Sequence, residues 1–124
     1  MIPMTDAPIF IYVSGPYTSN PDENTAEAIR IGNELWELGF VPFIPHLTHF
    51  WHKQIPRPYD DWLAMDLKWL TKCDAVFRLP GESSGADMEC VFARKLGLLV
   101  FHDVDSLTRF DWVQHKRIEA MRHV

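Results

Sequence analysis

The chain has 124 residues, 47% of them hydrophobic and 23% charged, which predicts one globular domain spanning residues 1–124. Its formal net charge of -5 argues against a nucleic-acid polymer as the partner, because phosphate backbones are bound by basic surfaces. A small anionic ligand is compatible with this charge, since a few backbone N–H groups can hold one phosphate.

The two cysteines, Cys73 and Cys90, are too few for a disulfide scaffold or a four-thiolate zinc site, so we expect buried, reduced thiols. The first residues lack the positive segment of a secretory signal, and no apolar run approaches the ~20 residues that cross a bilayer. These features predict a cytoplasmic protein that does not insert into membranes.

The first predicted strand is the apolar run IFIYVS at residues 9–14, which is typical of a strand buried on both faces of a parallel sheet. After a turn-rich segment, apolar residues at helical spacing predict a helix over residues 22–38, with Gly39 as its stop. A second strand, weakened by prolines, is expected at residues 40–46. The segment LTHFWHKQIPRPY after it predicts a long irregular loop, a kind of segment that is often functional.

The next helix is predicted within YDDWLAMDLKWLTKC, with Asp60 or Asp61 as its N-cap and with Trp62 and Trp69 in the core. The sequence DAVFRLP, at residues 74–80, predicts the third strand.

A helix is expected over residues 86–96, with Gly97 as its stop, and a fourth strand over residues 96–103. The tail, residues 107–124, predicts one amphipathic helix. Strands that alternate with helices indicate an α/β fold, a three-layer sandwich with a mostly parallel sheet.

Two loops, SGPYTS after the first strand and PGESSGADME after the third, are rich in small and hydroxylated residues. In such folds ligands bind at the carboxyl ends of the strands, and each loop leads into a helix N-terminus that favours a phosphate. Turns of this kind are also common structural links, and neither a G-x-G-x-x-G fingerprint nor a P-loop lysine is present. A phosphate site and a purely structural turn are both consistent with this pattern.

Glu89 follows the second loop and is expected to point toward the same strand ends. It has two interpretations, a nucleophile or a residue placed early in a helix by the helix dipole. Asp66 is likewise either a solvated residue or the second acid of a site. Two carboxylates in different environments are what cleavage of a glycosidic bond requires.

The segment PHLTHFWH places His46, His49 and His52 three residues apart, so on a helix they would share one side and could bind a metal. The absence of H-E-x-x-H and the flanking proline favour histidines that bond or stack in a ligand pocket, without a metal. Phe50 and Trp51 are candidates for stacking on a base.

The stretches IYVSGPYT, DLKWLTKCDAVFRLPG and SSGADMECVFARKLG together resemble the nucleoside 2-deoxyribosyltransferase superfamily, which includes the 2'-deoxynucleoside 5'-monophosphate N-glycosidases. The likeness runs from about Ile9 to Phe101, and one branch shares a similar PHLTHFWH loop and RLPGESSGADME. The resemblance implies a flavodoxin-like or Rossmann-like sheet, no cofactor, and a homodimer or larger homo-oligomer.

The resemblance also implies roles for individual residues. Glu89 matches the glutamate that attacks the anomeric carbon, Asp66 an aspartate that assists the proton at the departing base or orients the sugar, and Tyr12 a tyrosine that positions the glutamate. Ser83 stands where the monophosphate hydrolases bind the 5'-phosphate and where the transferases have Asp. Tyr17 replaces an arginine of the hydrolases, so the cation would come from elsewhere, such as Arg78 or a neighbouring chain.

We therefore expect an N-glycosidase that cleaves a (2'-deoxy)nucleoside 5'-monophosphate through a Glu89 ester. A deoxyribosyltransferase that exchanges bases, a nucleotide-binding module without turnover and a zinc protein built on the histidine loop are the alternatives. The residues expected to bind substrate are Ser14, Gly15, Tyr17, Ser83, Ser84, Gly85, His46, His49 and Trp51.

Overall fold

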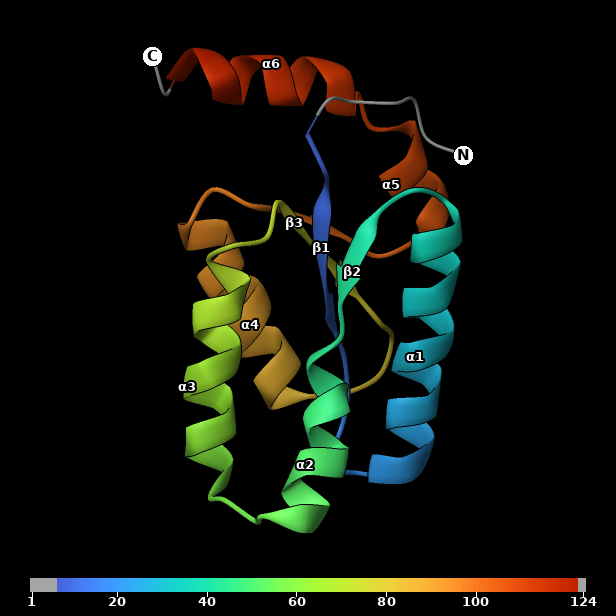
Figure 1. Cartoon of the computed structure of the whole chain (residues 1–124), viewed down its shortest axis with the longest axis vertical. Coiled ribbons are helices and arrows are strands. Elements are labelled where there is room, and N and C mark those ends of the chain that lie inside the picture. Colours follow the sequence, from blue (N-terminus) through green and yellow to red (C-terminus); the bar gives the residue numbers. More distant parts are fainter. Residues whose placement is uncertain (1–6, 123–124) are drawn as a thin grey trace.

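Figure 1 shows the computed structural model of the chain, which describes residues 7–122. Its elements in chain order are β1 (Phe10–Ser14), α1 (Pro21–Glu37), β2 (Val41–Phe43), the 3-10 helix η1 (Pro45–Leu47), α2 (Thr48–Gln54), α3 (Tyr59–Leu70), β3 (Ala75–Arg78), α4 (Ser84–Lys95), β4 (Leu99–Phe101), α5 (Val104–Arg109) and α6 (Trp112–Arg122). The four strands are all parallel and lie in the order β2-β1-β3-β4. The predicted α/β fold is confirmed.

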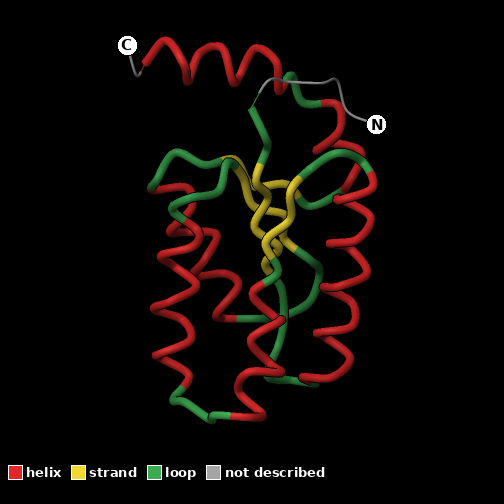
Figure 2. The backbone as a smooth tube through the Cα atoms, viewed as in Figure 1, coloured by secondary structure: helices red, strands yellow, loops and turns green. Residues whose placement is uncertain are grey.

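Alternate side chains of β1 face two different cores, because successive residues of a strand point to opposite sides of the sheet. Ile11 and Val13 pack in the core that holds α1 and α5, whereas Tyr12 packs in a second core with residues of α3 and α4. The helices accordingly lie on both sides of the central strands, as Figures 1 and 2 show. This is the expected three-layer arrangement.

The predicted helix stops are confirmed. Gly39 follows α1 with a φ of 104°, and Gly97 follows α4 with a φ of 81°. Glycine adopts this left-handed conformation far more readily than other residues. At both positions it lets the chain turn from the helix into the next strand.

The order of the strands positions the site. β1 pairs with β2 on one side and with β3 on the other. The chain therefore runs from β1 to β2 in one direction and then crosses back past β1 to reach β3. In open parallel sheets the crevice at such a switch point receives ligands. Ser14, the last residue of β1, lies opposite Arg78, the last residue of β3, and the two Gly/Ser loops therefore begin side by side.

The prediction of a long irregular loop over residues 47–59 was wrong in part, because η1 and α2 extend to residue 54 and only residues 55–58 are irregular. The Thr48 hydroxyl donates to the carbonyl oxygen of Pro45 at 2.9 Å, within this helical turn. A helix of 7 residues is too short to display a reliable period in sequence.

The prediction of a single helix over residues 107–124 was also wrong in part. The chain is extended at Phe110 (ψ 141°), which separates α5 from α6, and residues 123–124 lie outside the described residues. Trp112 explains the break: it is 1% exposed, its ring packs against Phe40 and Phe110, and its Nε1–H donates to the carbonyl oxygen of Leu107.

Two further details differ from prediction. Trp69 is 50% exposed, with its ring stacked on Phe43, and Trp62 is only half-buried, so neither is a core residue. Asp60 and Asp61 lie in the first turn of α3 rather than capping it, because Pro58 occupies the N-cap position.

Both cysteines are free, as predicted, although only Cys90 is buried and Cys73 is half-buried. Within residues 7–122, the helices are too short or too polar for any of them to span a membrane.

Candidate active site

A cavity of about 520 Å³ opens at the carboxyl edge of the sheet, between the loops after β1 and β3, the start of α4, and α2 and α3. Its volume falls in the usual range for a small-molecule site. Eight of the predicted site residues line it: Gly15, Tyr17, His46, Asp66, Ser83, Ser84, Gly85 and Glu89.

Glu89 projects from the buried face of α4. The buried residues of this helix are Ala86, Glu89, Cys90 and Ala93, spaced as one helical stripe facing the sheet. Glu89 is 7% exposed, so a carboxyl group occupies a position where an apolar side chain is expected. This stripe is visible in the sequence, and it distinguishes Glu89 from a solvated residue of the first helical turn.

Two buried hydroxyl groups hold the Glu89 carboxyl. Tyr12 donates its hydroxyl to Oε2, and Ser14 donates to Oε1 at 2.9 Å. Both donors are completely buried and lie behind Glu89, outside the set of cavity-lining residues. Tyr12 thus makes the contact that the sequence resemblance implied.

The pKa values of this group are shifted by opposing causes. Burial raises the pKa of Glu89, whereas the hydrogen bonds from Tyr12 and Ser14 and the charge of Arg78 act to lower it. Burial and the neighbouring Glu89 charge raise the pKa of Tyr12 well above its ordinary value, so Tyr12 stays a neutral donor.

Asp66, on α3, has a different environment. Burial and the Glu89 charge raise its pKa to about 7. Its Oδ1 is buried and has no hydrogen-bond partner among the described residues. The two carboxyl groups of the cavity therefore differ, since Glu89 receives two hydroxyl donors while Asp66 Oδ1 receives none.

His46 is the second cavity residue with an unused acceptor. Its Nε2 lies 2.9 Å from the carbonyl oxygen of Pro16, which can only accept, so Nε2 carries a proton. Nδ1 is buried and unpartnered within residues 7–122, and burial lowers the pKa of the ring, favouring its neutral form. Nδ1 and Asp66 Oδ1 can therefore each accept a hydrogen bond from a ligand in the cavity.

The residues at the start of α4, from Ser83 to Ala86, line the cavity. Ser83 caps the helix, its Oγ accepting the Ala86 N–H at 3.1 Å, so its own hydroxyl hydrogen remains available. The Tyr59 hydroxyl lies so close to Gly85 that a Cβ at this position would displace it.

Arg78 does not supply a cation to the cavity. Its guanidinium donates to the carbonyl oxygens of Leu79 and Gly81 and to Asp87 at 3.0 Å, and the residue does not line the cavity. Arg78 instead stabilises the loop that precedes α4.

Besides Ser14, two further predicted binding residues lie outside the cavity lining. His49 is buried behind Tyr17, with Nε2 at 2.8 Å from Asp22 and Nδ1 at 2.6 Å from the Tyr17 hydroxyl. Trp51 packs edge-on against Trp62, the ring centroids 5.0 Å apart, and Trp62 is the ring that lines the cavity.

The histidine segment also lacks the geometry of a metal site. His46, His49 and His52 each bond to different partners. The part of the chain that the structure describes contains no group of three or more potential ligands arranged for a metal ion.

Most of the cavity wall between α2 and α3 was not predicted from the sequence. Of its residues only His52 was a candidate, and Arg57, Tyr59, Trp62 and Leu63 were not expected to bind a ligand. Burial and the charges of Glu89 and Asp66 raise the pKa of Tyr59, which places its hydroxyl in the field of the carboxyl pair. Apart from the histidine spacing, the signal in sequence was the length of the aperiodic segment, which marks a region and not a residue.

Two solved structures share this fold. A 2-deoxyribosyltransferase from Leishmania mexicana matches with a TM-score of 0.58 and 22% identity, over 75% of this chain and 62% of that one, so the chain spans less than two thirds of its length. A 2-deoxyribosyltransferase from Bacillus psychrosaccharolyticus matches with a TM-score of 0.58 and 18% identity, over 85% of this chain and 94% of that one. Both likenesses confirm the fold.

No curated protein matches the chain by sequence. The model of one family, described as "Domain of unknown function (DUF4406)", matches residues 9–102, which include every element from β1 to β4 and all the residues of the carboxyl pair and its donors. The chain therefore belongs to the DUF4406 family.

Proposed function

We propose that the protein is an N-glycosidase that cleaves the bond between base and sugar in a (2'-deoxy)nucleoside 5'-monophosphate. The observation that carries the proposal is the unequal carboxyl pair, in which Glu89 is held by two hydroxyl donors and Asp66 Oδ1 has none. Hydrogen bonds to a carboxylate stabilise its charged form, so in this proposal Glu89 is the charged member of the pair and Asp66 the protonated one.

The pair then divides the chemistry. A Glu89 oxygen attacks the anomeric carbon, the electron pair of the breaking C–N bond passes to the base, and Asp66 protonates the base as it leaves. Water next attacks the glycosyl ester and gives a proton to Asp66, which regenerates the free enzyme. A pKa of about 7 for Asp66 suits a group that must both give and take a proton near neutral pH.

The unused acceptors support a sugar as the ligand. His46 Nδ1 and Asp66 Oδ1 are both buried at the cavity, and the described residues offer neither of them a donor. Sugar hydroxyl groups are donors that would complete both, whereas an aliphatic ligand would leave them unpaired.

The start of α4 supports a phosphate next to the sugar. The Ser83 hydroxyl and the N–H groups near Gly85 line the cavity at a helix N-terminus, which attracts an anion. Arg78 does not line the cavity, so in this proposal the start of α4 holds the phosphate and a neighbouring chain supplies the cation.

Chromatography of deoxynucleosides, ribonucleosides and their 5'-monophosphates after incubation with the protein tests the proposal, with Glu89→Ala as the matched inactive variant. Release of a free base from a monophosphate, lost in Glu89→Ala, is the expected result. Equal release by both proteins would contradict the role of Glu89. Binding without release would favour a nucleotide-binding module.

A deoxyribosyltransferase is the second candidate, favoured by the fold shared with the two deoxyribosyltransferases. In that reaction a second base, rather than water, takes the sugar from Glu89. Adding a foreign base to the assay separates the two reactions, because only the transferase yields the exchanged nucleoside. The homodimer also stays a prediction, to be tested by light scattering.

A further inference from the structure

The imidazole of His52 is held by two donors at one nitrogen. The Nε1–H of Trp62 donates to Nδ1 at 2.9 Å, and the backbone N–H of Arg57 donates to the same atom at 3.2 Å. The ring of Trp62 also contacts His52 edge-on, with centroids 5.8 Å apart. These contacts join α2, the following loop and α3 at a single atom.

This arrangement fixes the tautomer of the ring. A nitrogen that accepts two N–H groups cannot itself carry a proton, so the neutral ring carries its proton on Nε2. Nε2 has no hydrogen-bond partner within residues 7–122 and is not among the buried polar atoms without one, so it is an accessible N–H on a residue that lines the cavity. His52 thus presents an N–H donor to a ligand.

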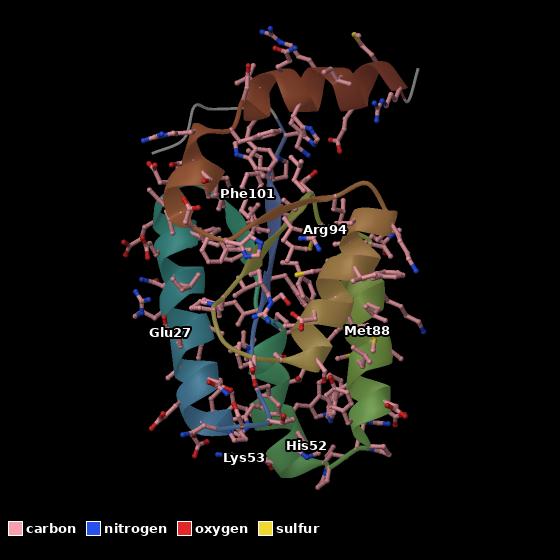
Figure 3. All side chains as sticks on the ribbon, turned by 180° about the vertical axis from the view of Figure 1, so that it is seen from behind. Glu27, His52, Lys53, Met88, Arg94 and Phe101 are labelled. Carbon is pink, nitrogen blue, oxygen red and sulfur yellow. The ribbon has the colours of Figure 1, made fainter. Side chains whose placement is uncertain are left out.

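The residues around His52 indicate which kind of ligand group its Nε2–H can bind. Arg57, which has donors and no acceptor, lines the same cavity, and its charge is partly balanced by the Asp61 carboxylate at 3.8 Å. Trp62 and Tyr59 add aromatic surface. Figure 3 shows His52 on α2, at the end of the molecule opposite Phe101 on β4. This corner therefore offers donors beside aromatic rings, which suits a planar base with an acceptor at its edge.

We propose that His52 Nε2–H and Arg57 recognise a carbonyl oxygen on the edge of the base, so that the site favours keto bases over their amino counterparts. The inference rests on the proposed function, because it assumes that the ligand is a nucleotide. An exocyclic amino group at the same position would place donor against donor, and a polar site rejects such a mismatch strongly.

The tautomer is tested first, and without any ligand. In protein labelled with ¹⁵N-histidine, the Nδ1 resonance of His52 is expected to be that of an unprotonated nitrogen and the Nε2 resonance that of an N–H. Exposed His102, outside the cavity, serves as the comparison. A proton on Nδ1 of His52 would overturn the inference.

Base preference is tested by calorimetry in Glu89→Gln, which removes the proposed nucleophile. The ligands form two isosteric pairs, the 5'-monophosphates of deoxyuridine and deoxycytidine and those of deoxyinosine and deoxyadenosine. We expect the keto member of each pair to bind about tenfold more tightly, as one hydrogen bond to a donor would give. Adding His52→Phe should reduce the ratio to about twofold or less, whereas His52→Gln, which restores a donor, should recover part of it.

His102→Phe is the matched control and should leave the ratio unchanged, with thermal unfolding confirming that each variant is folded. An unchanged ratio in His52→Phe, or tighter binding of the amino bases, would overturn the inference alone. Absence of binding by all four nucleotides would overturn the proposed function and this inference with it. A loss in His52→Phe that is confined to monophosphates, and not seen with the free nucleosides, would assign the donors to the phosphate and also overturn the carbonyl assignment.

Discussion

The two ends of the sheet both bury carboxyl groups, but they treat them differently. At the amino end, Asp74 is 9% exposed, its Oδ1 lies 2.6 Å from Lys116 Nζ, and its Oδ2 accepts the Phe10 N–H at 2.8 Å. At the carboxyl end, Glu89 and Asp66 share a cavity, and no cation lies within ion-pair distance of either among the described residues.

This difference separates a structural carboxylate from a functional pair. A buried charge that is paired and fully hydrogen-bonded stabilises one conformation. A buried carboxyl with an unused oxygen costs stability in the free protein, and the cost is offset only when a ligand supplies the missing partner. The predictions below test whether the two ends differ in this way.

The largest expected effect is on turnover. Glu89→Gln keeps the size of the side chain but removes the nucleophile, so base release should fall by about 10³-fold or more. The free energy of unfolding should change little, because the removal of a buried charge offsets the loss of one hydroxyl bond that the amide nitrogen cannot accept. Steady-state kinetics and urea denaturation measure the two quantities. Residual turnover close to that of the parent would remove Glu89 from the mechanism.

At the amino end of the sheet, a substitution of Asp74 should change stability and not turnover. Asp74→Asn leaves Lys116 without its buried partner and should lower the free energy of unfolding by about 2–3 kcal/mol, with base release per folded molecule unchanged. Asp105→Asn is the matched control, since its pair with Arg109 is exposed and should contribute about 0.5 kcal/mol or less. If Asp74→Asn abolished turnover in a folded protein, the division between the two ends would be wrong.

The third effect depends on pH. The pKa of Asp66 is raised from 3.8 to about 7 by burial and by Glu89, so its protonated form is favoured in the folded state. This contribution to stability is complete below about pH 4 and is lost as the pH rises through about 7.

Asp66→Asn has no charge to lose, so at pH 8 it should unfold with a free energy about 1–2 kcal/mol higher than the parent, and the difference should vanish near pH 4. Urea denaturation across this range measures it. The control is Asp60→Asn, an exposed position of the same helix, which should show no such trend. A variant less stable than the parent at pH 8 would identify Asp66 as a structural residue.

The smallest effect concerns the cap of α4. Ser83→Ala removes the acceptor of the Ala86 N–H and should lower the free energy of unfolding by about 1 kcal/mol. If Ser83 also binds the phosphate, the variant should lose affinity for monophosphates and not for free nucleosides. Ser84→Ala, one residue on and without a capping bond, is the control for stability. Equal losses for both ligand types would restrict Ser83 to capping.

Features set by local sequence were predicted well. The apolar run of β1 and the glycines that stop α1 and α4 depend on the preferences of a few neighbouring residues. The pairing of a hydroxylated strand end with a Gly/Ser loop followed from the edge rule for parallel sheets. Glu89 became a candidate because it follows the second Gly/Ser loop, and the resemblance to the deoxyribosyltransferase superfamily selected it together with Asp66.

Features that depend on contacts between distant residues were not predicted. The break between α5 and α6 depends on the burial of Trp112 against Phe40, and residues of the short helix α2 bond to distant ones, His49 to Asp22 and His52 to Trp62. Tyr59 carries no signal in sequence, since nothing local indicates that it lines the cavity.

By itself, the sequence determined the type and order of the main elements, because backbone preference and apolar spacing act within one element. Only the tertiary structure decided which polar groups are buried, which are paired and which are left open. That distinction depends on partners such as Tyr12 and Glu89, 77 residues apart in the chain, and it is the one that separates the carboxyl pair from Asp74.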